Sequence, residues 1–255
     1  MPDAGSRGRS FEPRGIALQV AIAVLAAVAY FLVRGAMDTA DAQAVRNAER
    51  IVALEQHLGF FWEPAWQSWI ADSHTLITLF NWIYIYGHWP VIAGVALWLA
   101  LRHPAHYRLT WNAFLISGAI GLVIFLTFPT APPRLTDHDV IDTVTEYSNA
   151  YRVLQPPGFT NQYAAVPSLH FGWNLLIGLA IIRCVRPMPL RALGVLLPVA
   201  MFFAIVLTAN HWIFDAIAGA AVAMAGLGIA LIIANRDRLR SACRQRSGQE
   251  QPSGV

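Results

Sequence analysis

The sequence predicts an all-α fold: a polytopic membrane helix bundle of six transmembrane helices with one outer amphipathic helix. Of the 255 residues, 56% are hydrophobic and only 13% are charged, which is atypical of a soluble domain. Six hydrophobic stretches have roughly the 20 residues that a helix needs to cross a bilayer. The arginines concentrate in alternate connections between those stretches.

The six expected spans are 16–34, 75–101, 109–128, 167–184, 189–209 and 211–234. The first has a long apolar part and no convincing small-residue cleavage site, so we expect a retained span and not a signal peptide. Gly87 and Pro90 predict a bend in the second. The first dozen and the last fifteen or so residues have the polar composition of disordered tails.

The arginines predict the orientation. All 18 basic residues are arginine, and 13 of them lie in the N-terminal tail, the 102–108 and 183–191 turns and the C-terminal tail. Because arginine-rich segments stay cytoplasmic, both termini are expected inside the cell. The 35–74 and 129–166 loops are then expected outside.

The outer loop 35–74 contains an amphipathic segment, AVRNAERIVALEQHLGFF. A helix would gather its apolar residues on one face, which comprises Val45, Ala48, Ile51, Val52 and Leu58. It is expected to lie at the outer membrane surface, with Trp62, Trp66 and Trp69 as interfacial anchors. Two interpretations of this segment remain open: a connector that packs on the bundle, and an element that helps to admit lipid.

A histidine and an aspartate open the sixth stretch, in NHWIFD. His211 and Asp215 are four residues apart, so a helix would place both side chains on one face. A carboxylate that binds one ring nitrogen fixes the tautomer and leaves the other nitrogen nucleophilic. The alternative is a histidine–aspartate contact that only ties this helix to a neighbour.

Two further polar segments lie at the same predicted side. In AVPSLH a helix start offers free backbone N–H groups, which bind phosphate; Ser168 can add a hydroxyl, and His170 can protonate a leaving group. In FPTAPPRL, Arg134 offers a planar guanidinium suited to two phosphate oxygens. Each motif alone has a simpler explanation, such as a capped helix with a packed histidine or an arginine that meets lipid headgroups. It is the occurrence of all three motifs at one predicted side that favours phosphate chemistry.

The ordered motifs PTAPPRL, YAAVPSLH and NHWIFDAIAG resemble the type 2 phosphatidic acid phosphatase superfamily, six-span membrane enzymes related to soluble vanadium-dependent haloperoxidases. They look most like the branch around fungal inositol phosphorylceramide synthase and its bacterial relatives. The likeness covers roughly residues 75–234. It implies that His211 is the nucleophile, that Asp215 orients it, and that His170 is the general acid.

The resemblance also implies the phosphate ligands. Ser168 and the backbone around Leu169 match the family's phosphate cradle, and Arg134 matches the arginine of the first motif. The broader family's K-x6-R-P and S-R-x5-H motifs require four residues that are replaced here, at Thr127, Leu135, Ala204 and Ile205. Leu169 also replaces the glycine of P-S-G-H. The resemblance therefore implies a variant site, and the expected helpers of Arg134 are Arg152, Tyr163 and Asn210.

The expected function is hydrolysis of a lipid phosphate or diphosphate, phosphatidic acid-like or polyprenyl diphosphate-like, at the outer leaflet of the plasma membrane, through a phosphohistidine. The alternative is a phosphotransferase that passes a phospho-headgroup, such as phosphoinositol or a phosphosugar, to a lipid or alcohol. A non-catalytic membrane scaffold is a second alternative, and a vanadate-dependent oxidant is the least expected. The expected division is a tail at 1–14, one catalytic membrane domain at 15–235 and an arginine-rich tail at 236–255.

No cofactor, metal or nucleic-acid partner is expected; the partners are the bilayer and a lipid phosphate. Cys184 and Cys243 lie beside arginine-rich segments and are expected to be free thiols outside any metal cluster. His88, one turn after Tyr84, is expected to form a buried polar pair in preference to a substrate contact. The acidic residues of the 137–146 stretch, expected on a solvated loop face, are Asp137, Asp139, Asp142 and Glu146.

Overall fold

The computed structural model describes residues 21, 25, 28–33, 35, 41–148 and 161–249, and these residues form helices joined by loops. The elements are α2 (Asp41–Leu58), α3 (Glu63–Ala71), α4 (His74–Tyr86), α5 (Trp89–Arg102), α6 (Pro104–Thr127), the 3₁₀ helix η1 (Pro133–Leu135), α7 (Thr143–Tyr147), α9 (Leu169–Cys184), α10 (Met188–Leu207) and α11 (Ile213–Gln249). No strand occurs among them, and the one isolated parallel bridge joins Thr130 to Ala164. The expected all-α class is confirmed for this part of the chain.

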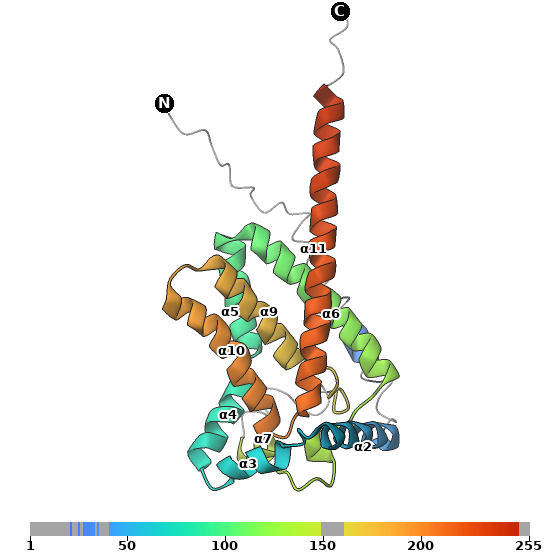
Figure 1. Cartoon of the computed structure of the whole chain (residues 1–255), viewed down its shortest axis with the longest axis vertical. Coiled ribbons are helices and arrows are strands. Elements are labelled where there is room, and N and C mark those ends of the chain that lie inside the picture. The colour runs from blue at the N-terminus through green and yellow to red at the C-terminus, as the bar shows by residue number, and fades with distance from the viewer. Residues whose placement is uncertain are drawn as a thin grey trace, which may run out of the picture.

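The long apolar helices form a bundle with two distinct ends (Figure 1). α11 packs on α6 and α9, and α10 packs on α9 and α4. The α5–α6 and α9–α10 turns lie at the end toward which the C-terminal part of α11 points. The short helices α2, α3 and α7 and the α10–α11 turn lie at the opposite end.

Three helices are long and apolar enough to cross a membrane, namely α6, α10 and the Ile213–Arg236 part of α11. α4 and α5 together make a fourth candidate if the bent pair is one span. α9 is apolar but has only 16 residues. Most of the first expected span, 16–34, lies outside the described residues, although residues 28–33 are helical. The expectation that the chain crosses the membrane six times therefore stays a prediction.

The bend expected at Gly87 and Pro90 is present, since the axes of α4 and α5 differ by 46°. α4 ends at Tyr86, and Gly87 is its C-cap, where an added Cβ would lie 2.3 Å from the carbonyl oxygen of Ile83. Pro90 lies in the first turn of α5, where the missing N–H costs nothing. His88 thus lies at a break in the helix and not within a continuous span.

The expected amphipathic helix is α2, but its buried face is rotated from the one predicted. Ala48, Ile51 and Val52 are buried as expected, whereas Val45 is 36% exposed and Leu58 is 57% exposed. The buried face packs on Ala131, Val166 and Trp212, which come from the loops at this end of the bundle. α2 is therefore a packed part of the bundle end.

The three tryptophans of the outer segment lie together on and beside α3. Trp66 contacts Trp62 and Trp69, with ring centroids 5.5 Å and 6.1 Å apart. Trp69 is 71% exposed, and Trp62 is exposed as well. Their part as interfacial anchors stays a prediction.

Up to Gln249, the C-terminal tail is helical, in contrast to its expected disordered character. α11 continues as one helix to Gln249, well beyond the apolar part that ends near Arg236. Alanine, arginine and glutamine are good helix formers, so the arginine-rich composition extends the helix already begun in the bundle. The boundary expected at residue 236, between the membrane domain and the arginine-rich tail, stays a prediction.

Two glycines let α9 and α11 approach each other at the end where the motifs lie. A Cβ at Gly219 would lie 2.2 Å from the carbonyl oxygen of Ser168, and one at Gly172 would lie 2.5 Å from that of Gly219. Neither position has room for a side chain. This close contact brings the start of α9 beside the first turn of α11, where Ser168 N donates to the carbonyl oxygen of Asp215 at 2.9 Å.

Candidate active site

His211 lies in the tight turn between α10 and α11. The backbone N–H groups of Asn210 and His211 both donate to the carbonyl oxygen of Ile205, at 3.1 Å and 3.0 Å. Ala209 has a φ of 55°, a left-handed conformation that a residue with a Cβ adopts at a cost of about 1–3 kcal/mol. The turn therefore holds the backbone of His211 in one position at the end of α10.

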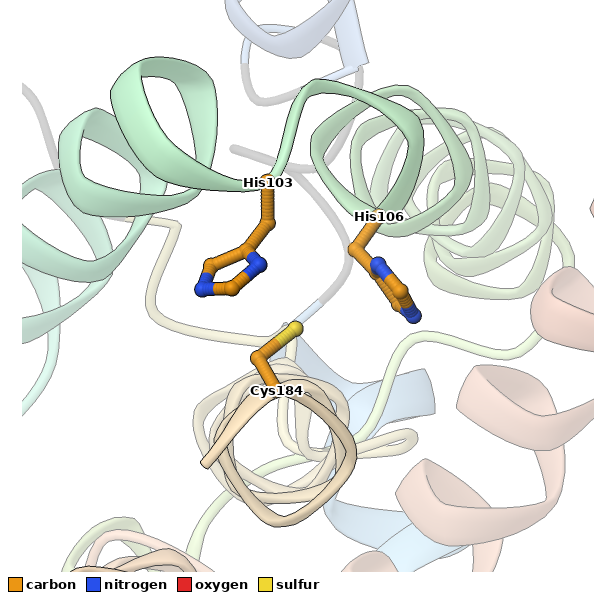
Figure 2. A group of neighbouring side chains, drawn as sticks. All are labelled: His103, His106 and Cys184. Atoms are coloured by element: carbon orange, nitrogen blue, oxygen red, sulfur yellow. The ribbon is translucent and has the colours of Figure 1, made fainter. Parts of the chain in front are cut away.

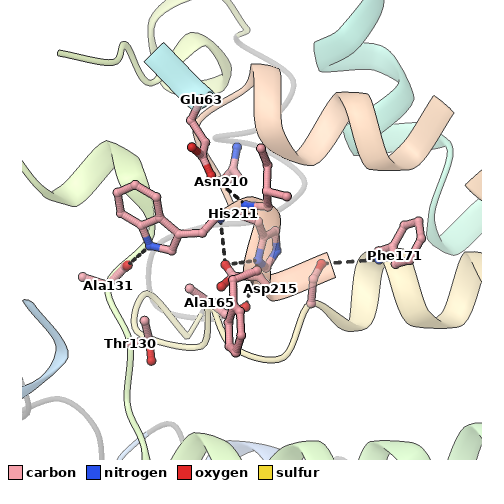
Figure 3. Close-up of polar contacts among 12 residues, drawn as sticks. Glu63, Thr130, Ala131, Ala165, Phe171, Asn210, His211 and Asp215 are labelled. Atoms are coloured by element: carbon pink, nitrogen blue, oxygen red, sulfur yellow. Dashed lines mark hydrogen bonds and ion pairs between the residues drawn. The ribbon is translucent and has the colours of Figure 1, made fainter. Parts of the chain in front are cut away.

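The imidazole of His211 is fixed by two acceptors on the same ring nitrogen. Nδ1 lies 2.9 Å from the carbonyl oxygen of Ala165 and 3.2 Å from Oδ2 of Asp215 (Figure 3). Asp215 is fully buried, and its Oδ2 also accepts from Trp212 N at 2.9 Å. Because both partners of Nδ1 are acceptors, Nδ1 carries the proton and Nε2 has a free lone pair.

The start of α9 supplies the backbone groups expected for a phosphate cradle. Ser168 is the N-cap, and its Oγ accepts from Phe171 N at 3.4 Å. Pro167 precedes this cap and lies two residues before Leu169, the first residue of α9. Ser168 N donates to the carbonyl oxygen of Asp215, and Gly172 N donates to that of Ser168. Among the described contacts, the backbone N–H groups of Leu169 and His170 therefore remain available to a ligand.

Arg134 reaches the same turn from the loop after α6. Its Nη1 donates to Oδ1 of Asn210 at 2.7 Å, and its backbone N–H donates to the carbonyl oxygen of Ala209 at 3.0 Å. Its Nε lies 3.5 Å from Oδ2 of Asp142. The expectation that Asp142 belongs to a solvated face is therefore wrong, because its carboxylate pairs with this guanidinium and caps α7 through Thr145 N.

The Arg134 loop is fastened to the segment that leads into α9. Thr130 N donates to the carbonyl oxygen of Tyr163, and Ala165 N donates to that of Thr130, at 2.8 Å and 3.2 Å. Trp212 Nε1 donates to the carbonyl oxygen of Ala131 at 2.9 Å (Figure 3). The three sequence motifs are therefore joined to one another by backbone acceptors.

His170 lies 5.8 Å from His211 between ring centroids. It stacks on Tyr84 at 4.7 Å and lies against the ring of His88 at 4.2 Å. His88 is buried, and its Nδ1 lies 3.2 Å from Nδ2 of Asn174. Tyr84 and His88 are both buried, as expected, and both lie against the imidazole of His170. Their pairing with each other stays a prediction.

The remaining expected helpers of Arg134 lie in different surroundings. Asn210 holds the guanidinium with its Oδ1, while its Nδ2 donates to Thr208. Tyr163 packs with Val33 and Phe125 in an apolar cluster. Arg152 lies outside the described residues. Asn210 therefore holds Arg134 as expected, while the parts of Tyr163 and Arg152 stay predictions.

Two buried glutamates, which sequence reasoning missed, cap the start of α11. Oε1 of Glu63 accepts from Ile213 N at 2.8 Å, and Oε1 of Glu55 accepts from Phe214 N at 2.7 Å. Both side chains are almost fully buried, and each Oε2 has no hydrogen-bond partner in the described structure. The available signal was an acidic residue, Glu55, on the apolar face of α2.

Burial keeps protons on this carboxyl pair. Desolvation, followed by the charge and hydrogen bonding of Glu63, raises the pKa of Glu55 to about 9. Burial raises the pKa of Glu63 as well. We infer that the two carboxyls share one proton, which leaves each Oε1 free to accept from the helix start.

A protein-family comparison gives a match that spans all three motifs. The family model described as "PAP2 superfamily" matches residues 49–229. The chain belongs to the PAP2 superfamily. A comparison with curated proteins and one with solved structures gave no match.

PAP2 membership, with the apolar helices, makes this a membrane protein and supports an enzyme of the phosphatase or phosphotransferase type that acts on a lipid phosphate. The structure also accounts for two replaced positions of the broader PAP2 pattern. Ala204 and Ile205 are fully buried and pack with Tyr84 and Ile85 of α4. Apolar side chains thus fill the place of the family's serine and second arginine.

Proposed function

We propose that this PAP2 protein hydrolyses a lipid phosphate or diphosphate through a phosphohistidine at His211. The observation that carries the proposal is the pair of acceptors on Nδ1 of His211, the carbonyl oxygen of Ala165 and Oδ2 of Asp215. Together they fix the tautomer in which Nε2 is the nucleophile. A second imidazole, His170, lies 5.8 Å away between centroids, as a two-histidine mechanism requires.

In the first step, Nε2 of His211 attacks the phosphorus, and the bond to the leaving lipid oxygen breaks. His170 gives its proton to that oxygen. As His211 becomes cationic, the buried carboxylate of Asp215 stabilises it. In the second step, His170 takes a proton from water, the water oxygen attacks phosphorus, and the bond between phosphorus and Nε2 breaks. Inorganic phosphate leaves, and both histidines return to their first state.

The transferring phosphoryl group gathers charge on its equatorial oxygens, so fixed donors aimed at them supply most of the acceleration. The proposed donors are the N–H groups of Leu169 and His170 and the hydroxyl of Ser168. Arg134 adds the guanidinium N–H groups that Asn210 and Asp142 do not hold. These groups balance the charge without a metal ion in the proposed steps.

The proposed substrate is a membrane lipid whose headgroup phosphate reaches the site at the outer leaflet while its tails stay in hydrocarbon. Two observations support this placement. The site lies at the end of the bundle away from the α5–α6 and α9–α10 turns (Figure 1), and those turns are the arginine-rich ones. The resemblance to the inositol phosphorylceramide synthase branch makes transfer to an alcohol the outcome to be tested beside hydrolysis.

The test uses the purified chain in detergent with phosphatidic acid or undecaprenyl diphosphate, in a buffer that contains a chelator. Phosphate release is expected with the native chain and is expected to be lost in His211→Ala. Asp215→Asn should keep the fold and lose about 10⁴-fold in rate, as when an amide replaces the carboxylate beside a catalytic histidine. Vanadate, a mimic of five-coordinate phosphorus, should inhibit.

Each outcome decides the proposal. Release that persists in His211→Ala rejects the nucleophile. Consumption of the lipid phosphate only after an alcohol such as inositol is added, with the phosphoryl group recovered on the alcohol and not as inorganic phosphate, assigns transfer in place of hydrolysis. Indifference to vanadate contradicts both reactions, and activity that needs a divalent ion contradicts the metal-free steps.

A further inference from the structure

We propose that His103, His106 and Cys184 form a binding site for a transition metal ion of the Zn²⁺ class, at the end of the bundle opposite the catalytic histidines. Each residue offers one ligand atom, and the three atoms all lie within 4.8 Å of one another. The side chains point toward one another (Figure 2). No sequence motif indicates such a site, because Cys184 is about eighty residues from the histidines.

The spacing of the ligand atoms is close to that of a bound site. With Zn–N bonds of about 2.0–2.1 Å and a Zn–S bond of about 2.3 Å, tetrahedral ligand atoms lie roughly 3.3–3.6 Å apart. Atoms already within 4.8 Å reach that spacing by small side-chain rotations. His106 is exposed and the other two are partly exposed, so an ion can enter and a water can take a fourth position.

The positions of the ligands come from helix ends. His103 is the residue between α5 and α6, and its backbone N–H donates to the carbonyl oxygen of Leu99 at 2.7 Å. Its ring is also held edge-on by Trp98, with centroids 4.9 Å apart. His106 follows one turn later in α6, so both rings lie on one side of that helix.

The chemistry of this ligand set selects the class of ion. Two imidazoles and one thiolate suit Zn²⁺, Co²⁺ and similar ions, whereas Mg²⁺ and Ca²⁺ prefer oxygen ligands. The thiolate supplies one negative charge. α5 and α9 both end at this site, so their C-terminal carbonyl ends add partial negative charge, which the N-terminal ends of α6 and α10 oppose.

A bound ion would join the α5–α6 turn to the end of α9, two segments that are distant in sequence. His170 lies in the first turn of α9 and Cys184 at its end, about 21 Å apart at 1.5 Å per residue. The ion is therefore too far from the phosphoryl site to act on substrate. Its expected effect is on the stability of the bundle, and the proposal does not depend on the proposed function.

The test uses Co²⁺ as a spectroscopic probe on the full chain in detergent, after treatment with a chelator. Co²⁺ bound to a thiolate gives an intense near-ultraviolet charge-transfer band that histidine ligands alone do not give. We expect this band at one Co²⁺ per chain, and its loss on addition of Zn²⁺. Zn²⁺ should also raise the temperature of thermal unfolding.

Matched variants locate the site. Cys184→Ser should abolish the band, while Cys243→Ser, which removes the other cysteine, should keep it. His106 is exposed, so the His106→Ala chain should fold. This variant loses a direct ligand, so its affinity for Co²⁺ should fall by more than the roughly 10- to 100-fold that removal of a residue supporting a ligand costs. Absence of the band in the native chain, its persistence in Cys184→Ser, or an unchanged affinity in His106→Ala would overturn the proposal.

Discussion

The imidazole of His170 is held by aromatic rings from another part of the bundle. Tyr84, at the end of α4, stacks on it, and His88 lies against it at the break before α5. Asn174, one turn later in α9, joins this group by contacting His88 and by donating to the carbonyl oxygen of His170 at 2.9 Å. The bend between α4 and α5 thus places a polar ring beside the proposed general acid.

From this contact we predict that His88 positions His170. His88→Ala should lower kcat by about 10- to 100-fold with little change in KM, because a displacement of about 1 Å in a catalytic group can cost about 10²-fold. Steady-state rates on a lipid phosphate, measured below the unfolding temperature, check this. The control is His74→Ala, which removes an exposed ring at the start of α4. An unchanged kcat in His88→Ala, or an equal loss in the control, would contradict a positioning role.

At the scale of elements, the first turn of α11 is held by side chains from α2 and α3. The first N–H groups of a helix have no partner within it, and here Glu55 of α2 and Glu63 of α3 accept from two of them. The same turn of α11 contains Asp215, whose carboxylate binds His211. Two buried carboxyls outside the three motifs therefore fix the helix start that orients the nucleophile.

This arrangement predicts how stability changes with pH. The pKa of Glu55 rises from its ordinary value of 4.5 to about 9 in the folded chain, so the fold binds a proton that the unfolded chain releases. The stabilisation is complete below about pH 4.5 and is lost as the pH rises toward about 9. Stability should therefore fall between neutral pH and pH 9.

Glu55→Gln tests this explanation, because the amide keeps an oxygen for Phe214 N and places a permanent donor toward Glu63. Its thermal unfolding should match the native chain near pH 6 and should decline less by pH 9. Glu55→Ala should lose about 1–3 kcal/mol even at pH 6, since it leaves Phe214 N–H unpaired. The same decline with pH in Glu55→Gln and the native chain would reject the shared proton.

Local signals explain which elements could be predicted from the sequence. Apolar stretches of span length located α6, α10 and most of α11. The contact of His211 with Asp215 is present as expected, but His211 lies in the turn before α11 and not on the shared helix face from which the contact was inferred. The side of α2 that is buried could not be predicted, because its partners come from distant segments. Ala44 packs in the cluster that contains Trp212, Asn47 donates to the carbonyl oxygen of Pro129, and Glu55 accepts from Phe214 N. The partners of His170 were missed for a similar reason, since Tyr84 and His88 reach it only through the bend at Gly87.

At the scale of the whole molecule, the two ends of the bundle have different chemistry. One end has the three motifs, the carboxyl pair and Arg134, and the other has the α5–α6 and α9–α10 turns with the His103, His106 and Cys184 cluster (Figures 1 and 2). The arginine-rich turns belong to the second end. We therefore propose that the first end faces outward and the second faces the cytoplasm.

Single cysteines test this orientation in intact cells, in a chain with Cys184→Ser and Cys243→Ser. Asp137→Cys, an exposed position in the loop after α6, should react with a membrane-impermeant maleimide added outside. Arg108→Cys, exposed near the α5–α6 turn, should react only after the cells are opened. Labelling of Arg108→Cys in intact cells with protection of Asp137→Cys would reverse the orientation.

The central claim is that His211 becomes phosphorylated during turnover. The most direct measurement is rapid mixing of the chain with a ³²P-labelled lipid phosphate, an alkaline quench that preserves phosphohistidine, and peptide mapping of the label. We predict acid-labile label on the peptide that contains His211, and none in His211→Ala. Label on a different residue, or steady turnover with no phosphorylated intermediate, would contradict the mechanism.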